Sequence, residues 1–419
     1  MKLSDAKYKW FALALLYVIY FLLQGTRQIY NVVLPQVQSD FGIADAAKLG
    51  VIAMAFKIAY GLVVPFAGVL ADVFSRKWMI VAGVLLFSVG TFVSGYSDGL
   101  WMLLAMYGVL AAVGQCFVPT SSTSLIAQLH PKTRATALSI YQTALYVGVV
   151  GCSVISGWLA GLGPGAWRKA FWFFGAFGLV MLAGLVFFLR DTPPVAQSDA
   201  KPGEKASALE AVLSMARNPS AILLTLGCGM GMYGSNGFLT WMKAFMEQDL
   251  HLSSAMASLH AFLWFYIGAL GGITVASRVS DRLAPTRKGV RMEMNILGLA
   301  CCAPCVWWVS QAPGATMCCV ALAAWGFAHG TYDSNLFASL YDVVSPRYRA
   351  VSTGVFLCLG FILGSFSPVV LGWIRDATSM RQGFASLSAF YIAGALVILV
   401  ARVFFLKRDY VQQEVAPSA

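Results

Sequence analysis

The chain has 419 residues, of which 59% are hydrophobic and 11% are charged. Soluble domains carry about 25% charged residues, so this composition excludes an ordinary soluble protein and indicates one embedded in a membrane. The formal net charge is +11. No basic stripe with interleaved aromatic residues stands outside the apolar runs, so we do not expect the chain to bind nucleic acid.

The apolar residues form twelve runs, which we interpret as membrane-spanning helices. Each run is about 18 to 26 residues long, which suits an α-helix crossing a hydrocarbon core of about 30 Å, and none has the alternating pattern of an outer-membrane barrel strand. The first run is too long for a signal peptide, so we expect it to be retained. The predicted spans are 10–35, 47–71, 79–96, 100–128, 135–162, 169–189, 220–246, 254–277, 291–310, 315–341, 350–374 and 382–406.

The distribution of basic residues predicts how these spans are oriented. The amino end and every second connection after it carry most of the Lys and Arg residues. The more basic face is normally cytoplasmic, so we expect a multi-pass protein of the cell inner membrane with both termini in the cytoplasm. The opposite connections hold only Lys48, Arg168, Lys169, Lys243, Arg375 and Arg381.

One long polar connection divides the spans into two groups of six. It begins near Pro193 and Pro194 and carries one predicted amphipathic turn near Leu209–Met215. Its mixed Ala, Ser, Lys and Glu composition is typical of a linker. We therefore predict an N-terminal six-helix half at 1–189, a cytoplasmic linker at 190–218, a C-terminal six-helix half at 219–406 and a cytoplasmic tail at 407–419.

The two halves repeat each other. The motif Pro131–Ala135 follows the fourth span, and a similar motif, Pro346–Ala350, follows the tenth span 215 residues later. Duplicated six-helix halves are a feature of carriers that bind substrate between the halves, near the membrane midplane. Glycine pairs four residues apart, such as Gly268 and Gly272, also predict close packing between helices.

A polar turn joins the second and third predicted spans. It places Gly68, Asp72, Arg76 and Lys77 in the pattern G-x-x-x-D-x-x-x-R-K. This turn resembles the loop signature that transporters of the major facilitator superfamily carry between their second and third helices. The alternative is an ordinary basic hairpin at the cytoplasmic face.

The turn departs from the usual signature at Val73 and Ser75, where a basic residue and a glycine are common. A degenerate second copy in the other half contains Asp281 and Arg282. The resemblance covers essentially the whole chain. It implies an all-α membrane protein with twelve transmembrane helices in two pseudo-repeated halves, a functional monomer, and gating by the two loops.

Motifs of catalysis are not evident in this sequence. The G-x-G-x-x-G match at 229–234 lies in an apolar span with no preceding strand, so a nucleotide site is not expected. The C-x-x-C match at 302–305 also lies within a span, where apolar filling is the better interpretation. We predict that the chain is not an enzyme and that it has no cofactor or metal site.

Function must then depend on polar residues inside the spans, because charge at that depth is costly and is usually tied to a pathway. In the first span Gln24, Arg27 and Asn31 share one helical face with Tyr20. We predict that this face lines a central cavity and that Gln24, Arg27 and Asn31 bind substrate. The alternative is an arginine that snorkels to the outer headgroups.

Residues 25–35 resemble the first helix of organic-anion carriers in this superfamily, in the branch similar to anion:cation symporters. Those helices often carry Asp-Arg or Tyr-x-x-Arg before a small apolar run that ends in proline. Here Thr26 replaces the acid, so a proton site at that position is absent. The resemblance implies transport of sugar acids, other carboxylates or organophosphates, often together with protons.

The second span carries Lys57 about ten residues from its start, near mid-membrane, with Tyr60 one turn away. We predict that both join Arg27 in the cavity. Two cations in a low dielectric repel each other and attract an anion, which arginine grips with two hydrogen bonds and lysine holds as a point charge. The alternative is a structural pair between Lys57 and Asp333.

The tenth span carries His329 and Asp333, which lie four residues apart on one helical face. Both groups can change protonation within a reachable pH range when buried, so we predict that they couple transport to protons. The alternative is a packed histidine–aspartate hydrogen bond that fixes the helix geometry.

Further polar and aromatic residues complete the predicted substrate site. Hydroxyl, amide and indole groups could contact a polyol or sugar acid, although each alone could equally serve helix packing. From the first half these residues are Gln142 and Tyr146, and from the seventh span they are Tyr233, Asn236 and Trp241.

The sequence therefore predicts a secondary active transporter of the cytoplasmic membrane that works by alternating access. We expect it to move a small organic anion, a sugar acid or another carboxylate, by proton symport. Three alternatives stay open: an organophosphate/phosphate antiporter, an efflux carrier for amphipathic compounds or lipids, and a carrier-like solute sensor. The segment Gly148–Ser153 lacks the Gly-Pro run common in drug antiporters.

Overall fold

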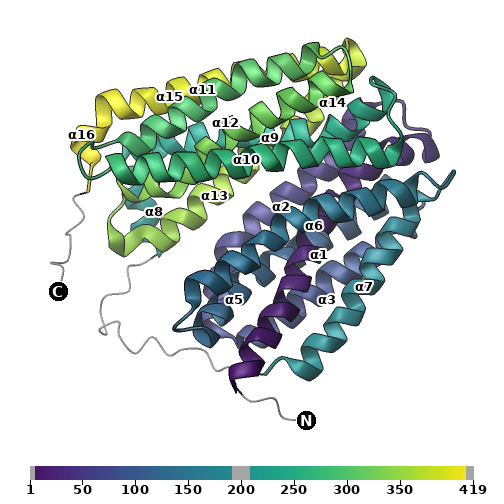
Figure 1. Cartoon of the computed structure of the whole chain (residues 1–419), viewed down its shortest axis with the longest axis horizontal. Coiled ribbons are helices and arrows are strands. Elements are labelled where there is room, and N and C mark those ends of the chain that lie inside the picture. Colours follow the sequence, from purple (N-terminus) through teal and green to yellow (C-terminus); the bar gives the residue numbers. More distant parts are fainter. Residues whose placement is uncertain (1–4, 191–207, 412–419) are drawn as a thin grey trace. The chain divides into compact units, whose positions relative to one another are not determined.

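The computed structural model of the chain describes residues 5–190 and 208–411. The predicted amphipathic turn near 209–215 is present as a helix, whereas the linker residues 191–207 and the tail residues 412–419 lie outside the described part. Side chains are also not described at positions 5, 6, 68, 69, 71–73, 135, 208, 209 and 350. Every regular element in the described ranges is helical (Figure 1).

The first half of the chain forms the elements up to the start of the linker. They are α1 (Asp5–Asp40), α2 (Ala46–Val73), α3 (Arg76–Ser94), α4 (Leu100–Leu103), the π-helix η1 (Leu104–Ala111), α5 (Ala112–Leu129), α6 (Arg134–Ala160) and α7 (Trp167–Phe188).

The second half follows the short linker helix. Its elements are α8 (Ala208–Ala216), α9 (Pro219–Gln248), α10 (Ser254–Leu283), α11 (Val290–Gln311), α12 (Ala315–Tyr341), the 3₁₀ helix η2 (Pro346–Tyr348), α13 (Arg349–Ser365), α14 (Ser367–Ala377), α15 (Met380–Val400), the π-helix η3 (Ala401–Phe405) and α16 (Leu406–Asp409).

These elements confirm the twelve predicted spans and the all-α membrane fold. Ten helical segments within the described ranges are long and apolar enough to cross a membrane by composition alone. The other two predicted spans are α9 and α12, which have 30 and 27 residues. They carry charged and amide side chains, among them Lys243, Glu247 and Asp333, and these lower the mean hydropathy of the helices that were predicted to hold functional residues.

Two predicted spans are not continuous α-helices. The fourth span contains the π-helix η1 between α4 and α5, and the eleventh is divided at Phe366 into α13 and α14. Pro368 stands at the second position of α14. Proline lacks the backbone N–H group and its ring clashes with the carbonyl four residues earlier, so it is accommodated in a first helical turn and not inside a helix.

The described residues form two compact units, which do not follow the two sequence halves. Unit 1 comprises α1–α7 together with residues 239–263 and 367–377. Unit 2 comprises α8 and residues 219–238, 264–366 and 378–411. The segments of the second half that belong to unit 1 are the end of α9, the start of α10 and α14. The predicted division into an N-terminal half at 1–189 and a C-terminal half at 219–406 stays a prediction.

Small residues let the helices of unit 1 approach each other closely. In α1 and α6, which pack together, any side chain added at Gly25 would meet Cys152, and one at Gly148 would meet the Phe21 backbone. Two further glycines lie where α2 contacts α14: an added carbon at Gly50 would lie 2.6 Å from the Pro368 carbonyl oxygen, and Gly372 faces the backbone of 46 and 47. These positions hold glycine because the neighbouring backbone occupies the space of a side chain.

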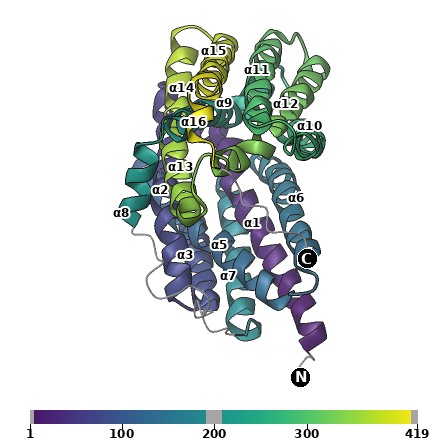
Figure 2. The ribbon, with the colours of Figure 1, turned by 90° about the vertical axis from the view of Figure 1, so that its left-hand side faces the viewer.

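Unit 2 contains a reciprocal glycine contact between α10 and α12. Gly268 and Gly272 of α10 face carbonyl oxygens of α12, and Gly326 and Gly330 of α12 face carbonyl oxygens of α10. This contact confirms the close packing predicted for Gly268 and Gly272. Beyond it, α11 packs against both α12 and α15 (Figure 2).

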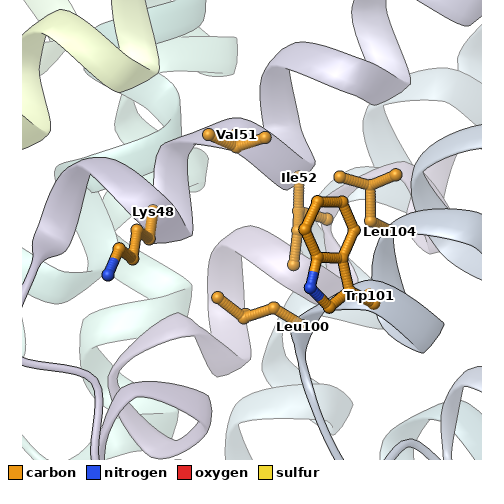
Figure 3. Close-up of a pocket in the computed structure, with 6 residues that line it drawn as sticks. All are labelled: Lys48, Val51, Ile52, Leu100, Trp101 and Leu104. Carbon is orange, nitrogen blue, oxygen red and sulfur yellow. The ribbon is translucent and has the colours of Figure 1, made fainter.

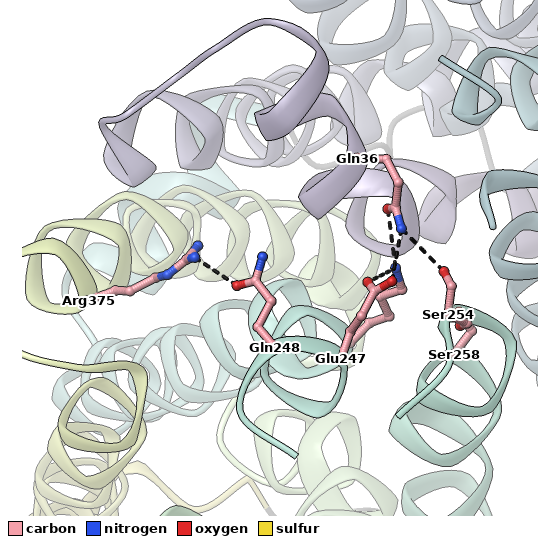
Figure 4. A network of polar contacts seen from close by, with 7 residues as sticks. Gln36, Glu247, Gln248, Ser254, Ser258 and Arg375 are labelled. Atoms are coloured by element: carbon pink, nitrogen blue, oxygen red, sulfur yellow. Dashed lines mark hydrogen bonds and ion pairs between the residues drawn. The ribbon is translucent and has the colours of Figure 1, made fainter. Parts of the chain in front are cut away.

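A buried polar network in unit 1 joins α1 to the end of α9 (Figure 4). Lys243 is fully buried and is paired with Glu247, one turn further along α9. The Lys243 ammonium also donates to Gln36 Oε1 at 3.2 Å, and Gln36 Nε2 donates to Glu247 Oε1 at 3.0 Å. A buried charge is tolerated only when it is paired and hydrogen-bonded, so this arrangement explains how α9 carries a lysine at full burial.

We expect Lys243→Met to lower the free energy of unfolding by about 3 kcal/mol, because it leaves Glu247 without its buried partner. Unfolding of the purified protein by a denaturing detergent would measure the change. The double variant Lys243→Met/Glu247→Gln removes both charges and should recover part of that loss. Equal losses in the single and double variants would contradict a stabilising role for charge pairing.

Candidate functional site

The predicted polar face of α1 lies inside unit 1. Tyr20, Gln24 and Asn31 are each less than 10% exposed, and Arg27 is half-buried. Gln24 Nε2 donates to the Tyr20 hydroxyl at 2.9 Å, and Asn31 Nδ2 donates to Gln28 Oε1 at 2.8 Å. The face is therefore turned toward other helices of the unit. Its Gln24 and Asn31 amides donate hydrogen bonds to other side chains of α1.

Arg27 is held by residues from two other helices. Its Nε donates to Gln115 Oε1 of α5 at 2.7 Å. Its guanidinium carbon lies 4.3 Å from the centroid of the Tyr60 ring of α2. A cation over an aromatic face is stabilised by the ring quadrupole. Because Arg27 contacts α5 and α2, it points into unit 1, which disfavours the alternative that it snorkels to the headgroups.

Gln115 and Tyr107 fix the surroundings of Arg27. Gln115 is fully buried, and its Nε2 donates to the Thr26 hydroxyl at 3.2 Å, so its amide is oriented with the oxygen toward Arg27. The Tyr107 hydroxyl lies 2.9 Å from the backbone carbonyl oxygens of both Thr26 and Arg27. Arg27 Nη2 is buried and makes no hydrogen bond within the described part of the chain. The hydrogen bond to Gln115 therefore fixes the Nε side of the guanidinium, whereas Nη2 is left without a hydrogen bond among the described residues.

Lys57 lies close to this arginine. It sits on α2 one turn before Tyr60, is half-buried, and its charge interacts unfavourably with that of Arg27. The structure therefore brings together the two cations that the sequence singled out from different spans. Their repulsion in a membrane interior makes an anion favourable at this place.

Aromatic side chains surround the two cations. Tyr20 stacks on Tyr141 of α6 with ring centroids 4.3 Å apart, and the Tyr60 ring lies against Arg27. Gln142, predicted at this site, is exposed on α6. The sequence analysis missed Tyr141 and Tyr107. Tyr141 is next to Gln142 in the sequence but five residues before Tyr146, so helical spacing from Tyr146 gave no signal for it.

In unit 2, His329 and Asp333 contact each other on α12. His329 Nδ1 lies 3.1 Å from Asp333 Oδ2, with side-chain exposures of 11% and 45%. His329 Nε2 is buried and has no hydrogen-bond partner among the described residues. The Phe265, Trp325 and Tyr332 rings lie 5.5 to 5.8 Å from the imidazole, measured between centroids. Aromatic rings therefore surround the imidazole of His329, and the Asp333 carboxylate is partly exposed.

The residues predicted on the seventh span are divided between the units. Tyr233 and Asn236 belong to unit 2, where Tyr233 stacks on Phe390 of α15 at 4.0 Å. Trp241 belongs to unit 1 and is fully buried, and its indole N–H donates to the Pro368 carbonyl oxygen at 2.9 Å. The Trp241 indole therefore packs α9 against α14.

The predicted gating loops are only partly described. Only the backbone is described at Gly68 and Asp72. Arg76 is buried, and Lys77 Nζ donates to the Val186 carbonyl oxygen of α7 at 2.8 Å. Asp281 and Arg282 are exposed at the end of α10.

Ion pairs that the sequence analysis missed lie near the second loop. Arg287 and Arg402 both pair with Glu293 at 2.9 Å, and Arg291 pairs with Asp342 at 2.7 Å. These contacts join the start of α11 to the end of α12 and to η3 near the end of the described chain.

Membrane-length helices that enclose charged, hydroxyl and aromatic side chains define a multi-pass membrane transporter. The sequence model described as Major Facilitator Superfamily matches residues 16–368, and the chain belongs to this family.

Individual relatives and a solved structure are consistent with that assignment. The chain is 27% identical to human protein spinster homolog 1 over 368 residues, which is 82% of this chain and 69% of the relative. It is 23% identical to the probable galactarate/D-glucarate transporter GudP of Escherichia coli K12, covering 100% of this chain and 97% of that one. The fold resembles the crystal structure of a bacterial homologue of the human lysosomal transporter Spinster, with a TM-score of 0.84, 22% identity, and coverage of 97% and 99%.

We expect Tyr60→Leu to lower the free energy of unfolding by about 1 kcal/mol, because the half-buried guanidinium of Arg27 loses the aromatic face beneath it. Tyr60→Phe keeps the ring and is the matched control, with a smaller loss. Unfolding in detergent would compare the two variants. If phenylalanine and leucine destabilise the protein equally, the ring face does not hold Arg27.

Proposed function

We propose that this transporter carries a small organic anion, a sugar acid or another carboxylate, across the cytoplasmic membrane. The observation that carries the proposal is the geometry of Arg27 in unit 1, which Gln115 and Tyr60 hold in place while its buried Nη2 makes no hydrogen bond within the described residues. The similarity to a probable galactarate/D-glucarate transporter supports the same class of substrate.

The geometry of Arg27 suggests how the anion binds. Gln115 occupies the Nε position, and Tyr60 covers one face of the guanidinium. The Nη groups are therefore the donors that a carboxylate meets, and planar guanidinium suits two parallel hydrogen bonds to one carboxylate. The anion replaces the repulsion between Arg27 and Lys57 with two attractions, so these side chains become mutually compatible when substrate is bound.

Substrate selectivity would come from the neutral groups nearby. The Tyr20, Tyr60 and Tyr146 hydroxyls and the Gln24 amide can share hydrogen bonds with the hydroxyls of a sugar acid. Tyr233 and Asn236 of unit 2 stay predicted substrate contacts in this proposal. A site built to hydrogen-bond hydroxyl groups discriminates strongly against analogues that lack them, because its own polar groups are then left unpaired.

His329 and Asp333 serve as the proton site in this proposal. Asp333 is 45% exposed, and its Oδ2 lies 3.1 Å from His329 Nδ1. Protonation of the carboxylate removes that contact and changes the charge of the α12 face. Proton binding would then accompany anion binding during alternating access, in a functional monomer whose termini lie in the cytoplasm, as the distribution of basic residues favours.

We expect Arg27→Ala to abolish uptake, because the guanidinium provides the directed contacts to the carboxylate. The first experiment is thermal stabilisation of the purified protein by sugar acids, simple carboxylates, organophosphates and lipophilic cations, followed by uptake into proteoliposomes of the ligand that binds. Arg278→Ala, an exposed arginine on α10, is the matched control and should transport normally. Stabilisation by cations alone, or undiminished uptake by Arg27→Ala, would contradict the cationic substrate site.

We expect Asp333→Asn to lose proton-driven accumulation while keeping exchange of labelled for unlabelled substrate, because the substrate site in unit 1 is unchanged. Proteoliposomes with and without an imposed pH gradient separate the two activities. Accumulation that persists in Asp333→Asn at the wild-type level would show that the proton is carried elsewhere. Uptake that depends on internal phosphate and ignores the pH gradient would instead indicate antiport.

A further inference from the structure

A second cavity in unit 1 lies away from the cationic site. It has a volume of about 380 Å³, which is within the range of small-molecule sites. Residues of α2 and of the α4–η1 segment line it, and Figure 3 shows Lys48 at one end and Trp101 with Leu104 at the other. The remaining lining residues are Val51, Ile52 and Leu100.

The cavity opens where two membrane helices begin. Lys48 is in the first turn of α2, after the N-cap residue Asp45, and Trp101 is in the first turn of α4, after Gly99. Trp101 is 84% exposed, the highest exposure among the large hydrophobic side chains of the described residues. Tryptophan at the end of a span is characteristic of the interface between hydrocarbon and headgroups. The mouth of the cavity is therefore at headgroup level.

The two helices close together one to two turns deeper. A side chain added at Gly108 of η1 would lie 3.4 Å from Ala55 Cβ and 3.5 Å from the Ile52 carbonyl oxygen, which are ordinary van der Waals distances, so α2 and η1 pack side by side there. Gly108 is one turn below Leu104 and two turns below Leu100. The cavity is thus a slot between these two helices with mostly apolar walls.

The Lys48 ammonium stands at one end of this slot, exposed beside Asp45, and Asp376 accepts a hydrogen bond from the Ala46 backbone N–H at the same helix start. It lies 4.0 Å from Asp45 Oδ2, and the two side chains are 67% and 45% exposed. An exposed pair at that separation contributes little. Asp45 also accepts a hydrogen bond from the Ala47 backbone N–H as the helix cap, which directs one carboxylate oxygen away from the lysine.

We infer that this slot binds one anionic phospholipid, with the acyl chain between α2 and α4–η1 and the phosphate at Lys48. An acyl chain suits the apolar walls better than a soluble anion does. A soluble anion would make no favourable contact with Val51, Ile52, Leu100 and Leu104. The cation at the mouth favours an anionic headgroup over a neutral one. The Trp101 indole lines the slot at the end opposite Lys48. This lipid is a resident ligand and is independent of the transported substrate.

Native mass spectrometry of the full chain in detergent tests the inference, with phosphatidylglycerol and phosphatidylcholine of identical acyl chains as probes. We expect the wild type to favour phosphatidylglycerol about fivefold, which is the contribution of one basic residue near a headgroup. Lys48→Ala should remove that preference and leave phosphatidylcholine binding unchanged. Lys169→Ala, an exposed lysine near the start of α7, is the matched control and should keep it.

Val51→Trp fills the slot and should reduce binding of both phospholipids. Lys48→Ala changes an exposed side chain and should not disturb folding, so it tests the headgroup contact independently of the slot. Melting of each variant in lipid-free detergent checks that the fold is intact. Preference for phosphatidylglycerol in Lys48→Ala equal to wild type would overturn the inference. Displacement of bound phosphatidylglycerol by soluble glycerol phosphate would also overturn it, because the site would then recognise a solute.

Discussion

The cost of placing charge inside a membrane protein governs this structure, and Lys243 and Arg27 meet that cost differently. Lys243 is fully buried, and Glu247 and Gln36 satisfy it. Arg27 has one amide partner and one aromatic face, with a buried nitrogen that makes no hydrogen bond in the described chain. The first arrangement is complete in itself. In the second, Gln115 and Tyr60 hold the guanidinium while Nη2 stays without a hydrogen bond among the described residues.

Patterns that depend on neighbouring residues were predictable from the sequence. Run length gave the twelve spans because hydrocarbon thickness fixes helix length, and a spacing of four placed His329 beside Asp333. Contacts between distant segments were not predictable in the same way. Arg27 and Gln115 are 88 residues apart, and nothing local to either residue specifies that they meet. The π-helix η1 carries no local marker of this kind, whereas Pro368 was a usable local signal for the division at Phe366.

The glycine contacts make the same point about packing. The sequence identifies Gly268 and Gly272 as a small face on α10, and Gly326 and Gly330 have an equal spacing on α12. Only the structure shows that each pair meets carbonyl oxygens of the other helix. This contact brings Phe265 of α10 against His329, so the environment of the candidate proton site follows from residues with no side chain. In unit 2 the close approach of the α10 and α12 backbones therefore determines which ring packs against His329.

The ion pair of α9 has a consequence for motion. Lys243 and Glu247 belong to one helix, one turn apart, so each carries its counter-charge with it wherever that helix goes. The bonds that reach across to α1 come from Gln36, a neutral amide. Parting α9 from α1 therefore never separates opposite charges, and water can replace each bond that is lost. Breaking the bonds between α9 and α1 therefore costs less than separating an ion pair would.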